Sequence, residues 1–261
     1  MTPEHMRELA ERLATARREG RQLAALPPAL LPANAAEGYA VNQRVAACLG
    51  WEPLGWKIAA TTPAMQARLR TDQPIYGRTY RRFALPSLAV LAHAALLDPL
   101  VECEFFVTLG ADLPPRAAPW TMAEILPAVA RVEAGIEVAE CRFPMAALPP
   151  VPAILADGSA SGHYVFGGEI AAWRDGLAAM EVVLEVDGAA RRRGSGAEVM
   201  GDPLAPLLWL AEERRRWGDG LRAGEVVSTG TATGMFPVRA GQEVRAVFGE
   251  VAEVRISFAA A

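Results

Sequence analysis

The spacing of apolar residues changes along the chain, from helical periodicity near the N-terminus to short extended runs further on. Between residues 3 and 24 apolar positions recur every three or four residues among Glu and Arg, which predicts an amphipathic helix. A second helix is predicted over 35–49 and is ended by Gly50. Three prolines within 25–32 indicate a linker or an extended arm between the two helices.

From residue 53 onward most apolar runs are short and bounded by Gly or Pro, as is typical of strands. Strands are expected over 53–60, within 86–98, and over 100–109, 132–140, 164–167, 180–186, 198–200, 225–229, 236–238, 243–248 and 253–258. The segments 180–186 and 198–200 are interpreted as the two arms of a hairpin. Short helices are expected over 63–69, 120–129 and 204–217, and turns or loops over 71–77, 144–153 and 157–162.

This order of elements predicts an α+β fold: N-terminal helices followed by a mainly β body with a few inserted helices. We expect a single domain overall, with residues 1–50 as an N-terminal helical segment and residues 51–261 as the body. The helix over 204–217 is expected to have a basic outer face, and the arginines at 191–193 are expected to lie in a turn.

Composition narrows the class of protein. With 52% hydrophobic and 21% charged residues the chain has ample material for a core. The net charge of −4, without a basic stripe, makes nucleic acid an improbable partner. The three scattered cysteines favour a reduced cytoplasmic setting. No apolar run is long enough to span a membrane, and the charged N-terminus shows no secretory signal.

The run over 100–109 carries the first candidate chemistry. Side chains alternate along a strand, so Glu102 and Glu104 are expected on one face. Two like charges on an otherwise apolar strand are costly to bury, and a divalent cation would remove that cost. Ligation by carboxylates alone suits a hard ion such as Mg²⁺, Mn²⁺ or Ca²⁺. The alternative is an exposed strand face with two solvated glutamates.

Lysine usage supplies the second candidate. Of 26 basic residues only Lys57 is lysine, which indicates a position where arginine will not serve. Arginine cannot be deprotonated in a protein, whereas a buried lysine can work as an acid or base. The alternative is the chance survival of one surface lysine. His5, His93 and His163 are isolated and show no zinc-ligand spacing, so a structural role is favoured for each.

Several short motifs, in one order and spacing, resemble a known family. They are Gly55-Trp56-Lys57-Ile58-Ala59, Thr61-Thr62-Pro63-Ala64-Met65-Gln66, Gln73-Pro74-Ile75-Tyr76-Gly77, Val101-Glu102-Cys103-Glu104, Ile136-Glu137-Val138-Ala139-Glu140-Cys141-Arg142, Ala156-Asp157, Gly201-Asp202-Pro203 and Thr229-Gly230. From about residue 35 to the C-terminus the chain is similar to the 2-keto-4-pentenoate hydratase and 4-oxalocrotonate decarboxylase branch of the fumarylacetoacetate hydrolase superfamily. The resemblance implies a fumarylacetoacetase-like β-roll body and a homo-oligomer, with a pathway enzyme as a possible partner.

The resemblance also implies roles for individual residues. It implies that Glu102, Glu104 and Glu137 hold Mg²⁺ or Mn²⁺, and that the catalytic residues are Lys57, Glu140 and Asp157. We expect burial and the metal charge to lower the pKa of Lys57. The substrate-binding residues implied are Thr62, Ile75, Tyr76, Ser159 and Thr229, with Ile75 and Tyr76 shaping the far end of the pocket.

The implied activity is that of a divalent-metal-dependent lyase acting on 2-oxo or 2-hydroxydienoate acids from aromatic catabolism, with the hydratase favoured. Two departures keep alternatives open. Ile75 stands where the hydratases commonly have Asp, which resembles the decarboxylases. Asp157-Gly158-Ser159-Ala160 stands where the family usually has Asp-Asn-Ala-Ser, which would suit a non-catalytic paralogue. A C–C bond hydrolase is a further alternative, to be favoured by a His–Glu pair near the metal, for instance through His163.

Overall fold

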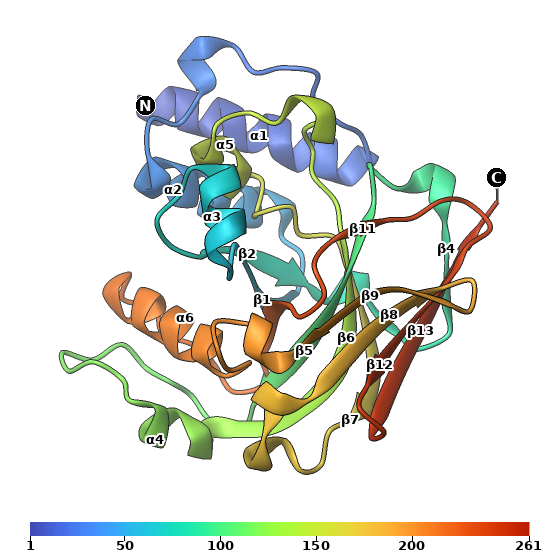
Figure 1. The fold of residues 1–261 in the computed structure, drawn as a ribbon. Coiled ribbons are helices and arrows are strands. Elements are labelled where there is room, and N and C mark those ends of the chain that lie inside the picture. Colours follow the sequence, from blue (N-terminus) through green and yellow to red (C-terminus); the bar gives the residue numbers. More distant parts are fainter. Residues whose placement is uncertain (261) are drawn as a thin grey trace.

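The structure, a computed structural model that describes residues 1–260, has its N-terminal helices at one end and two curled sheets as its body (Figure 1). The helices are α1 (Pro3–Glu19), α2 (Ala35–Leu49), α3 (Pro63–Leu69), α4 (Met122–Ile125), α5 (Val151–Ala156) and α6 (Ala205–Arg216). The strands are β1 (Pro53–Ala59), β2 (Ile75–Tyr80), β3 (Ala84–Pro86), β4 (Ala89–Ala92), β5 (Leu100–Leu109), β6 (Val129–Ala139), β7 (His163–Glu169), β8 (Glu181–Val186), β9 (Ala189–Ser195), β10 (Val226–Thr231), β11 (Phe236–Pro237), β12 (Glu243–Phe248) and β13 (Ala252–Ala259). The predicted α+β class is confirmed.

Strand β5 lies at the centre of the larger sheet. That sheet has eight strands in the order β2-β1-β10-β5-β6-β7-β3, with β11 also paired to β5. The smaller sheet has the order β4-β13-β12-β8-β9. Strand β5 pairs with antiparallel β6 along its whole length, and only its first residue is not buried. A strand buried on both faces reads as a continuous apolar run, which is why β5 stands out in the sequence.

The two faces of β5 have different roles. Phe105 packs edge-to-face on Phe248 of β12, with ring centroids 5.2 Å apart, so this face joins the two sheets. Glu102, Glu104 and Phe106 alternate onto the opposite face. The ring of Phe106 lies over Gly135 of β6, where a Cβ atom would come within 2.5 Å of it. The absence of a side chain at Gly135 therefore leaves room for the Phe106 ring on the same face as the two glutamates.

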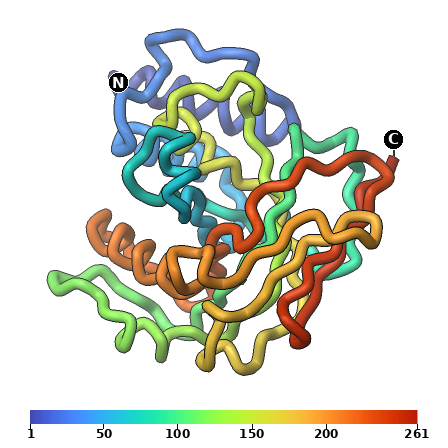
Figure 2. Tube along the Cα trace, in the orientation of Figure 1, coloured from blue at the N-terminus to red at the C-terminus, as the bar shows by residue number. Residues whose placement is uncertain are grey.

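A separate apolar core holds the N-terminal helices together. Leu9 and Leu13 of α1 pack with Val41 and Val45 of α2, and Phe143 joins the same cluster. Figure 2 shows the blue α1–α2 segment lying beside the yellow-green stretch that contains α5. This core therefore draws in residues beyond the first fifty, and the division at residue 50 stays a prediction.

Several elements begin and end where the sequence pattern placed them. Helix α2 has the predicted bounds and ends at Gly50, which adopts φ of 61°. Helix α3 also has the predicted bounds, because Thr62 accepts a hydrogen bond from the Met65 amide and Pro63 occupies the first turn. The strand over 243–248 has the predicted bounds as well.

Other predictions were wrong where exposure or proline changes the pattern. The second arm of the hairpin is Ala189–Ser195, not 198–200, and it contains the arginines expected in a turn. Its side chains are mostly exposed, so apolar alternation is missing. The segment 71–77 was expected to be a turn, but strand β2 begins at Ile75. The proline-rich segment 144–153 contains the start of α5, because Pro152 is tolerated in a first helical turn.

Helix boundaries also differ. Helix α1 ends at Glu19 rather than 24, because Gly20 adopts a left-handed conformation. Helix α4 ends at Ile125, and a 3₁₀ turn that contains Pro127 replaces the rest of the predicted helix. The basic residues of α6 do not all face solvent: Arg214 is buried, and its guanidinium lies 4.2 Å from the centre of the Trp56 ring.

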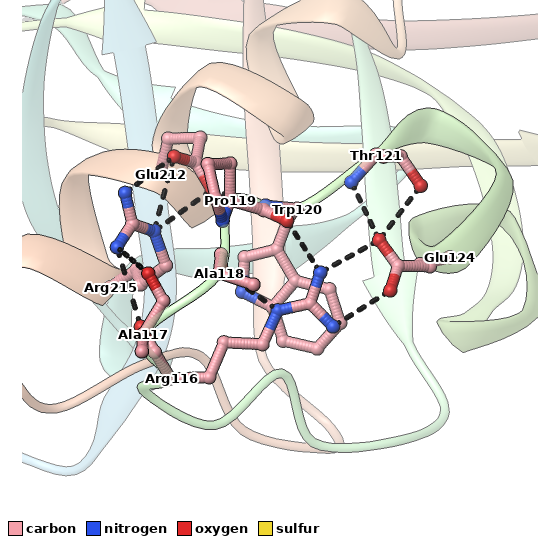
Figure 3. A network of polar contacts seen from close by, with 9 residues as sticks. All are labelled: Arg116, Ala117, Ala118, Pro119, Trp120, Thr121, Glu124, Glu212 and Arg215. Carbon is pink, nitrogen blue, oxygen red and sulfur yellow. Dashed lines mark hydrogen bonds and ion pairs between the residues drawn. The ribbon is translucent and has the colours of Figure 1, made fainter.

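An ionic network ties the loop before α4 to α6, away from the cavity described below (Figure 3). Arg116 makes two hydrogen bonds of 2.8 and 2.7 Å to the Glu124 carboxylate, which also caps α4 through Thr121. Glu212 of α6 accepts from the Trp120 amide and from Arg215. The network anchors the long loop before α4 to α6 and has a structural role.

Within residues 1–260, no helix combines the length and the apolar character that crossing a membrane would require.

Candidate active site

Three buried carboxylates meet on the inner face of β5 and β6. Glu102 and Glu104 share a face of β5 as predicted, and Glu137 is the direct partner of Glu102 across the β5–β6 pair. One carboxylate oxygen from each residue lies within 4.8 Å of the others. All three side chains are buried, so the alternative of an exposed strand face is wrong.

The burial and proximity of the three carboxylates favour a bound cation. Burial raises the pKa of Glu102 to about 7, with Glu137 adding to the rise and Lys57 opposing it. Burial, Glu137 and Glu102 likewise raise the pKa of Glu104 well above its ordinary value. One oxygen of Glu137, Oε2, is buried and has no hydrogen-bond partner among residues 1–260. An all-oxygen set with an unpaired buried oxygen fits a hard divalent ion.

Lys57 lies beside the trio. Its Nζ atom is 3.1 Å from Glu137 Oε1 and donates a 3.1 Å hydrogen bond to the Ser159 carbonyl. Burial lowers the pKa of Lys57, but Glu137, Glu102 and Glu104 outweigh it, so the pKa is raised. Three carboxylates thus stabilise the ammonium more than burial disfavours it. The expectation of a lowered pKa included the charge of a bound metal ion, which would repel the ammonium, so it stays a prediction.

Strand β10 supports the trio from the other side of β5. The Ser228 hydroxyl and the Gly230 amide both donate to Glu104 Oε2, the amide at 3.0 Å. Their neighbour Thr229, the predicted substrate contact, is fully buried and does not line the cavity. The register of β10 against β5 shifts between Ser228 and Thr231, and Gly230 there adopts φ of 100°. This irregularity allows a side chain and a backbone amide of the same strand to donate to one carboxylate oxygen.

A cavity of about 440 Å³ lies beside the carboxylates and is apolar over most of its wall. Seven of the predicted site residues line it: Lys57, Thr62, Ile75, Glu102, Glu104, Glu140 and Ser159. Glu137 completes the carboxylate trio without lining the cavity. Apolar residues from several segments enclose the rest, including Met65, Leu69, Leu148, Ile154 and Met235.

Two further predicted residues lie elsewhere. Tyr76 stacks on Tyr39, with ring centroids 4.1 Å apart, and its hydroxyl faces Arg214 in a second, smaller pocket. Since Ile75 faces the cavity, its neighbour on the strand faces away. Asp157 is buried against Arg142, whose Nε donates to its Oδ1 at 2.8 Å. The direct substrate or catalytic roles predicted for Tyr76, Asp157 and Thr229 have no support in this geometry.

Some cavity residues were missed from the sequence. Met65, Arg68 and Leu69 share one face of α3 at helical spacing, a signal that was available. Arg193 and Glu198 also line the cavity and are exposed. Arg193 was not predicted because its segment was interpreted as a turn. Ser228 was not predicted because only the register of β10 against β5 shows that it contacts Glu104.

Glu140 connects the cavity to a histidine. His163 Nδ1 lies 3.0 Å from Glu140 Oε2, and the Leu97 amide donates to the other oxygen at 2.9 Å. Burial raises the pKa of Glu140, but His163, Arg142 and the Leu97 amide outweigh it and the pKa is lowered. The carboxylate is therefore charged at neutral pH. His163 itself does not line the cavity.

Replacing Asp157 with Asn is expected to lower the free energy of unfolding by about 3–5 kcal/mol. The change removes a buried carboxylate and leaves the buried guanidiniums of Arg142 and Arg17 without their counter-charge. Urea unfolding followed by circular dichroism measures it. Asp175→Asn, an exposed position, is the matched control and should change the free energy by less than about 0.5 kcal/mol. Equal stability of the two variants would contradict a structural role for Asp157.

Fold and site together define a metal-dependent enzyme with three buried carboxylates beside its cavity. Residues 62–259 match the family model described as Fumarylacetoacetate (FAA) hydrolase C-terminal, and the chain belongs to this family. The resemblance seen in the sequence is thereby confirmed.

Individual relatives cover almost the whole chain. The chain is 33% identical to a 2-keto-4-pentenoate hydratase of Burkholderia vietnamiensis over 254 residues, which is 96% of each protein. It is 28% identical to a 4-oxalocrotonate decarboxylase of Pseudomonas putida over 207 residues, covering 78% and 77%. The fold is that of a 4-oxalocrotonate decarboxylase from Pseudomonas putida G7 complexed with magnesium and adipate: TM-score 0.91, 24% identity, 99% and 98% coverage.

Proposed function

We propose that the protein is a divalent-metal-dependent lyase that adds water to a 2-hydroxydienoate or its 2-oxo tautomer, as a 2-keto-4-pentenoate hydratase does. The observation that carries the proposal is the buried trio Glu102, Glu104 and Glu137 with Lys57 at the wall of an apolar cavity. Full-length similarity to hydratases supports the choice of reaction. A homo-oligomer stays a prediction.

The metal is Mg²⁺ or Mn²⁺ in this proposal, held by Glu102, Glu104 and Glu137. Solved structures of the same fold are described with magnesium, calcium or Mn²⁺, which supports a hard divalent ion without selecting one. When bound, such an ion supplies positive charge that stabilises an enolate oxygen.

The chain's own residues would supply binding and proton transfer. Lys57 holds a proton at Nζ, next to the cavity, and would exchange it with the carbon skeleton of the substrate. The charged Glu140 carboxylate would accept a hydrogen bond from the water that adds to the distal double bond. The apolar wall would exclude other water from the reacting chain. Hydration adds a hydroxyl to one carbon and a proton to its neighbour, so nothing leaves.

Two alternatives each have one observation in their favour. Ile75 lines the cavity where the hydratases commonly have an acid, which favours decarboxylation of a 2-oxo diacid. The His163–Glu140 pair beside the cavity favours C–C bond hydrolysis of an acylpyruvate. Hydration ranks first because the relatives at 30–33% identity over nearly the whole chain are named hydratases.

Steady-state assays with Mg²⁺ or Mn²⁺ should show loss of 2-hydroxypenta-2,4-dienoate, and EDTA should abolish it. The assay is run side by side with 4-oxalocrotonate and with fumarylpyruvate. Preference for 4-oxalocrotonate, with release of CO₂, would move the assignment to the decarboxylase, and preference for fumarylpyruvate to the hydrolase. Metal binding without turnover of any of the three would contradict the lyase and favour a non-catalytic paralogue.

A further inference from the structure

A buried polar network connects the N-terminal helix α1 to Lys57. Arg17, near the end of α1, is buried, and its Nη2 atom donates to the Asp157 carbonyl at 2.9 Å and to the Ser161 carbonyl at 3.1 Å. Arg142 donates to the same Ser161 carbonyl at 3.0 Å and binds the Asp157 carboxylate. Two guanidiniums thus hold both ends of the turn over 157–161.

This turn follows the C-terminus of α5, where carbonyl groups lack partners within the helix. Asn42 of α2 donates to the Ala156 carbonyl at 3.2 Å, so both N-terminal helices supply donors there. Positive charge is favourable at the C-terminus of a helix, which suits Arg17 and Arg142. The helices α1 and α2 therefore provide more than an apolar cover.

The turn is held in a demanding conformation. Ser159 and Ala160 have φ of 57° and 60°, a region that residues other than glycine rarely adopt. Gly77 of β2 approaches so closely that a Cβ atom there would come within 2.0 Å of the Gly158 carbonyl oxygen. The Ser159 hydroxyl donates to the Tyr76 carbonyl at 2.7 Å. Such a conformation persists where its surroundings determine it.

This conformation places one carbonyl group, that of Ser159, beside Lys57. The Ser159 carbonyl accepts the hydrogen bond of Lys57 Nζ, which lies equally far from Glu137 Oε1. The network also reaches Glu137 by a second route: Ser161 Oγ is 2.9 Å from the Tyr164 hydroxyl, which donates to Glu137 Oε1 at 3.3 Å. Both partners of the lysine are thus connected to the turn that Arg17 and Arg142 hold.

We propose that Arg17 is a positioning residue for the reaction, which acts through the turn over 157–161 to set the place of the Lys57 ammonium. The inference rests on the catalytic role of Lys57 in the proposed function. It extends the working site to α1, outside the residues that match the family model. It also explains the setting of Asp157: its carboxylate holds Arg142 and its carbonyl accepts from Arg17, so it belongs to the support of the site.

The test compares Arg17→Met with Arg18→Met. Arg18 is the next residue of the same helix, is exposed, and bonds only the Cys48 carbonyl among the described residues. Arg17→Met should lower kcat by about 10- to 100-fold, the effect of a misplaced catalytic group, while KM and the Kd for Mg²⁺ change less than about threefold. Arg18→Met should leave all three unchanged. Arg17→Lys, which can still donate to a carbonyl, should recover part of the lost kcat.

A spectroscopic readout separates positioning from stability. Since Lys57 is the one lysine of the chain, protein labelled with [¹³Cε]lysine and purified without a lysine-bearing tag gives a single side-chain signal. That signal should shift or broaden in Arg17→Met and remain in place in Arg18→Met. Circular dichroism confirms that each variant is folded at the assay temperature. If Arg17→Met does not fold, Arg17→Gln takes its place in the same comparison.

An unchanged Lys57 signal in a folded Arg17 variant would overturn the inference, as would a kcat equal to that of Arg18→Met. A loss of kcat that only parallels the loss of folded protein would overturn it as well. Failure of the proposed function looks different, because the wild-type protein would then turn over none of the three substrates. The Lys57 signal would still report on positioning in that case.

Discussion

Lys57→Met is expected to remove most of the turnover, lowering kcat by about 10²- to 10⁴-fold, while the protein still folds and binds its metal ion. Methionine has a similar length and keeps the packing, but it cannot carry a proton. Metal affinity should be unchanged or higher, because the ammonium sits 3.1 Å from Glu137 Oε1 and repels any cation in the carboxylate trio. Steady-state kinetics and isothermal titration with Mg²⁺ give the two quantities.

Lys57→Arg separates charge from proton transfer. Arginine keeps the positive charge beside Glu137 but cannot release a proton in a protein. It should therefore be nearly as inactive as Lys57→Met, without the gain in metal affinity. A Lys57→Met protein with full activity would remove Lys57 from the mechanism, and an active Lys57→Arg protein would leave it only an electrostatic role.

Local sequence signals predicted the parts of the site that lie within single elements. The alternation of residues along 100–109 put Glu102 and Glu104 on one face, and β5 is a strand with these bounds. Thr62 as the N-cap and Pro63 in the first turn fixed the start of α3. Lysine usage singled out Lys57, which is buried beside the trio. In each case periodicity, capping or residue choice within a few positions contains the information.

What the sequence could not supply is the register between distant segments. Ser228 rather than Thr229 meets Glu104, because β10 pairs with β5 in one register out of several. Arg17 and Asp157 are far apart in the chain, and nothing near either one predicts the other. The same holds for the raised pKa of Lys57, which depends on three carboxylates from two other strands. Such contacts are decided by tertiary packing, which local propensity does not encode.

Glu102→Gln is the change in the metal site with the clearest expected result. Among residues 1–260 the structure records no hydrogen bond from a protein group to the Glu102 carboxylate. Glu104 accepts two hydrogen bonds, and Glu137 accepts one from Tyr164 and is paired with Lys57. The change therefore removes one charge and one metal ligand with little other loss. We expect affinity for Mg²⁺ and kcat/KM to fall by at least about 100-fold, more than the loss usually seen when a neighbour of a ligand is changed.

The stability of the same variant should change in opposite directions with and without the ion. In EDTA at pH 8, above its pKa of about 7, Glu102 is ionised although burial, with Glu137 adding to it, disfavours the charge more than Lys57 favours it. Gln should therefore raise Tm by removing this buried charge. With the ion present, wild type should gain about 2.7 kcal/mol at 100 times its Kd, and the variant much less. Thermal unfolding in EDTA and in excess Mg²⁺ measures both effects.

Glu133→Gln is the matched control, since it removes the same charge from the same sheet outside the trio. It should leave the ion-dependent rise in Tm intact. If Glu102→Gln were less stable than wild type in EDTA, the ionised Glu102 carboxylate would not destabilise the ion-free protein. If it kept the full ion-dependent rise, the ion would bind elsewhere. A crossing of the two stability orders on adding Mg²⁺ is specific to a cluster that is costly when empty and favourable when filled, because loss of a merely structural carboxylate would lower Tm under both conditions.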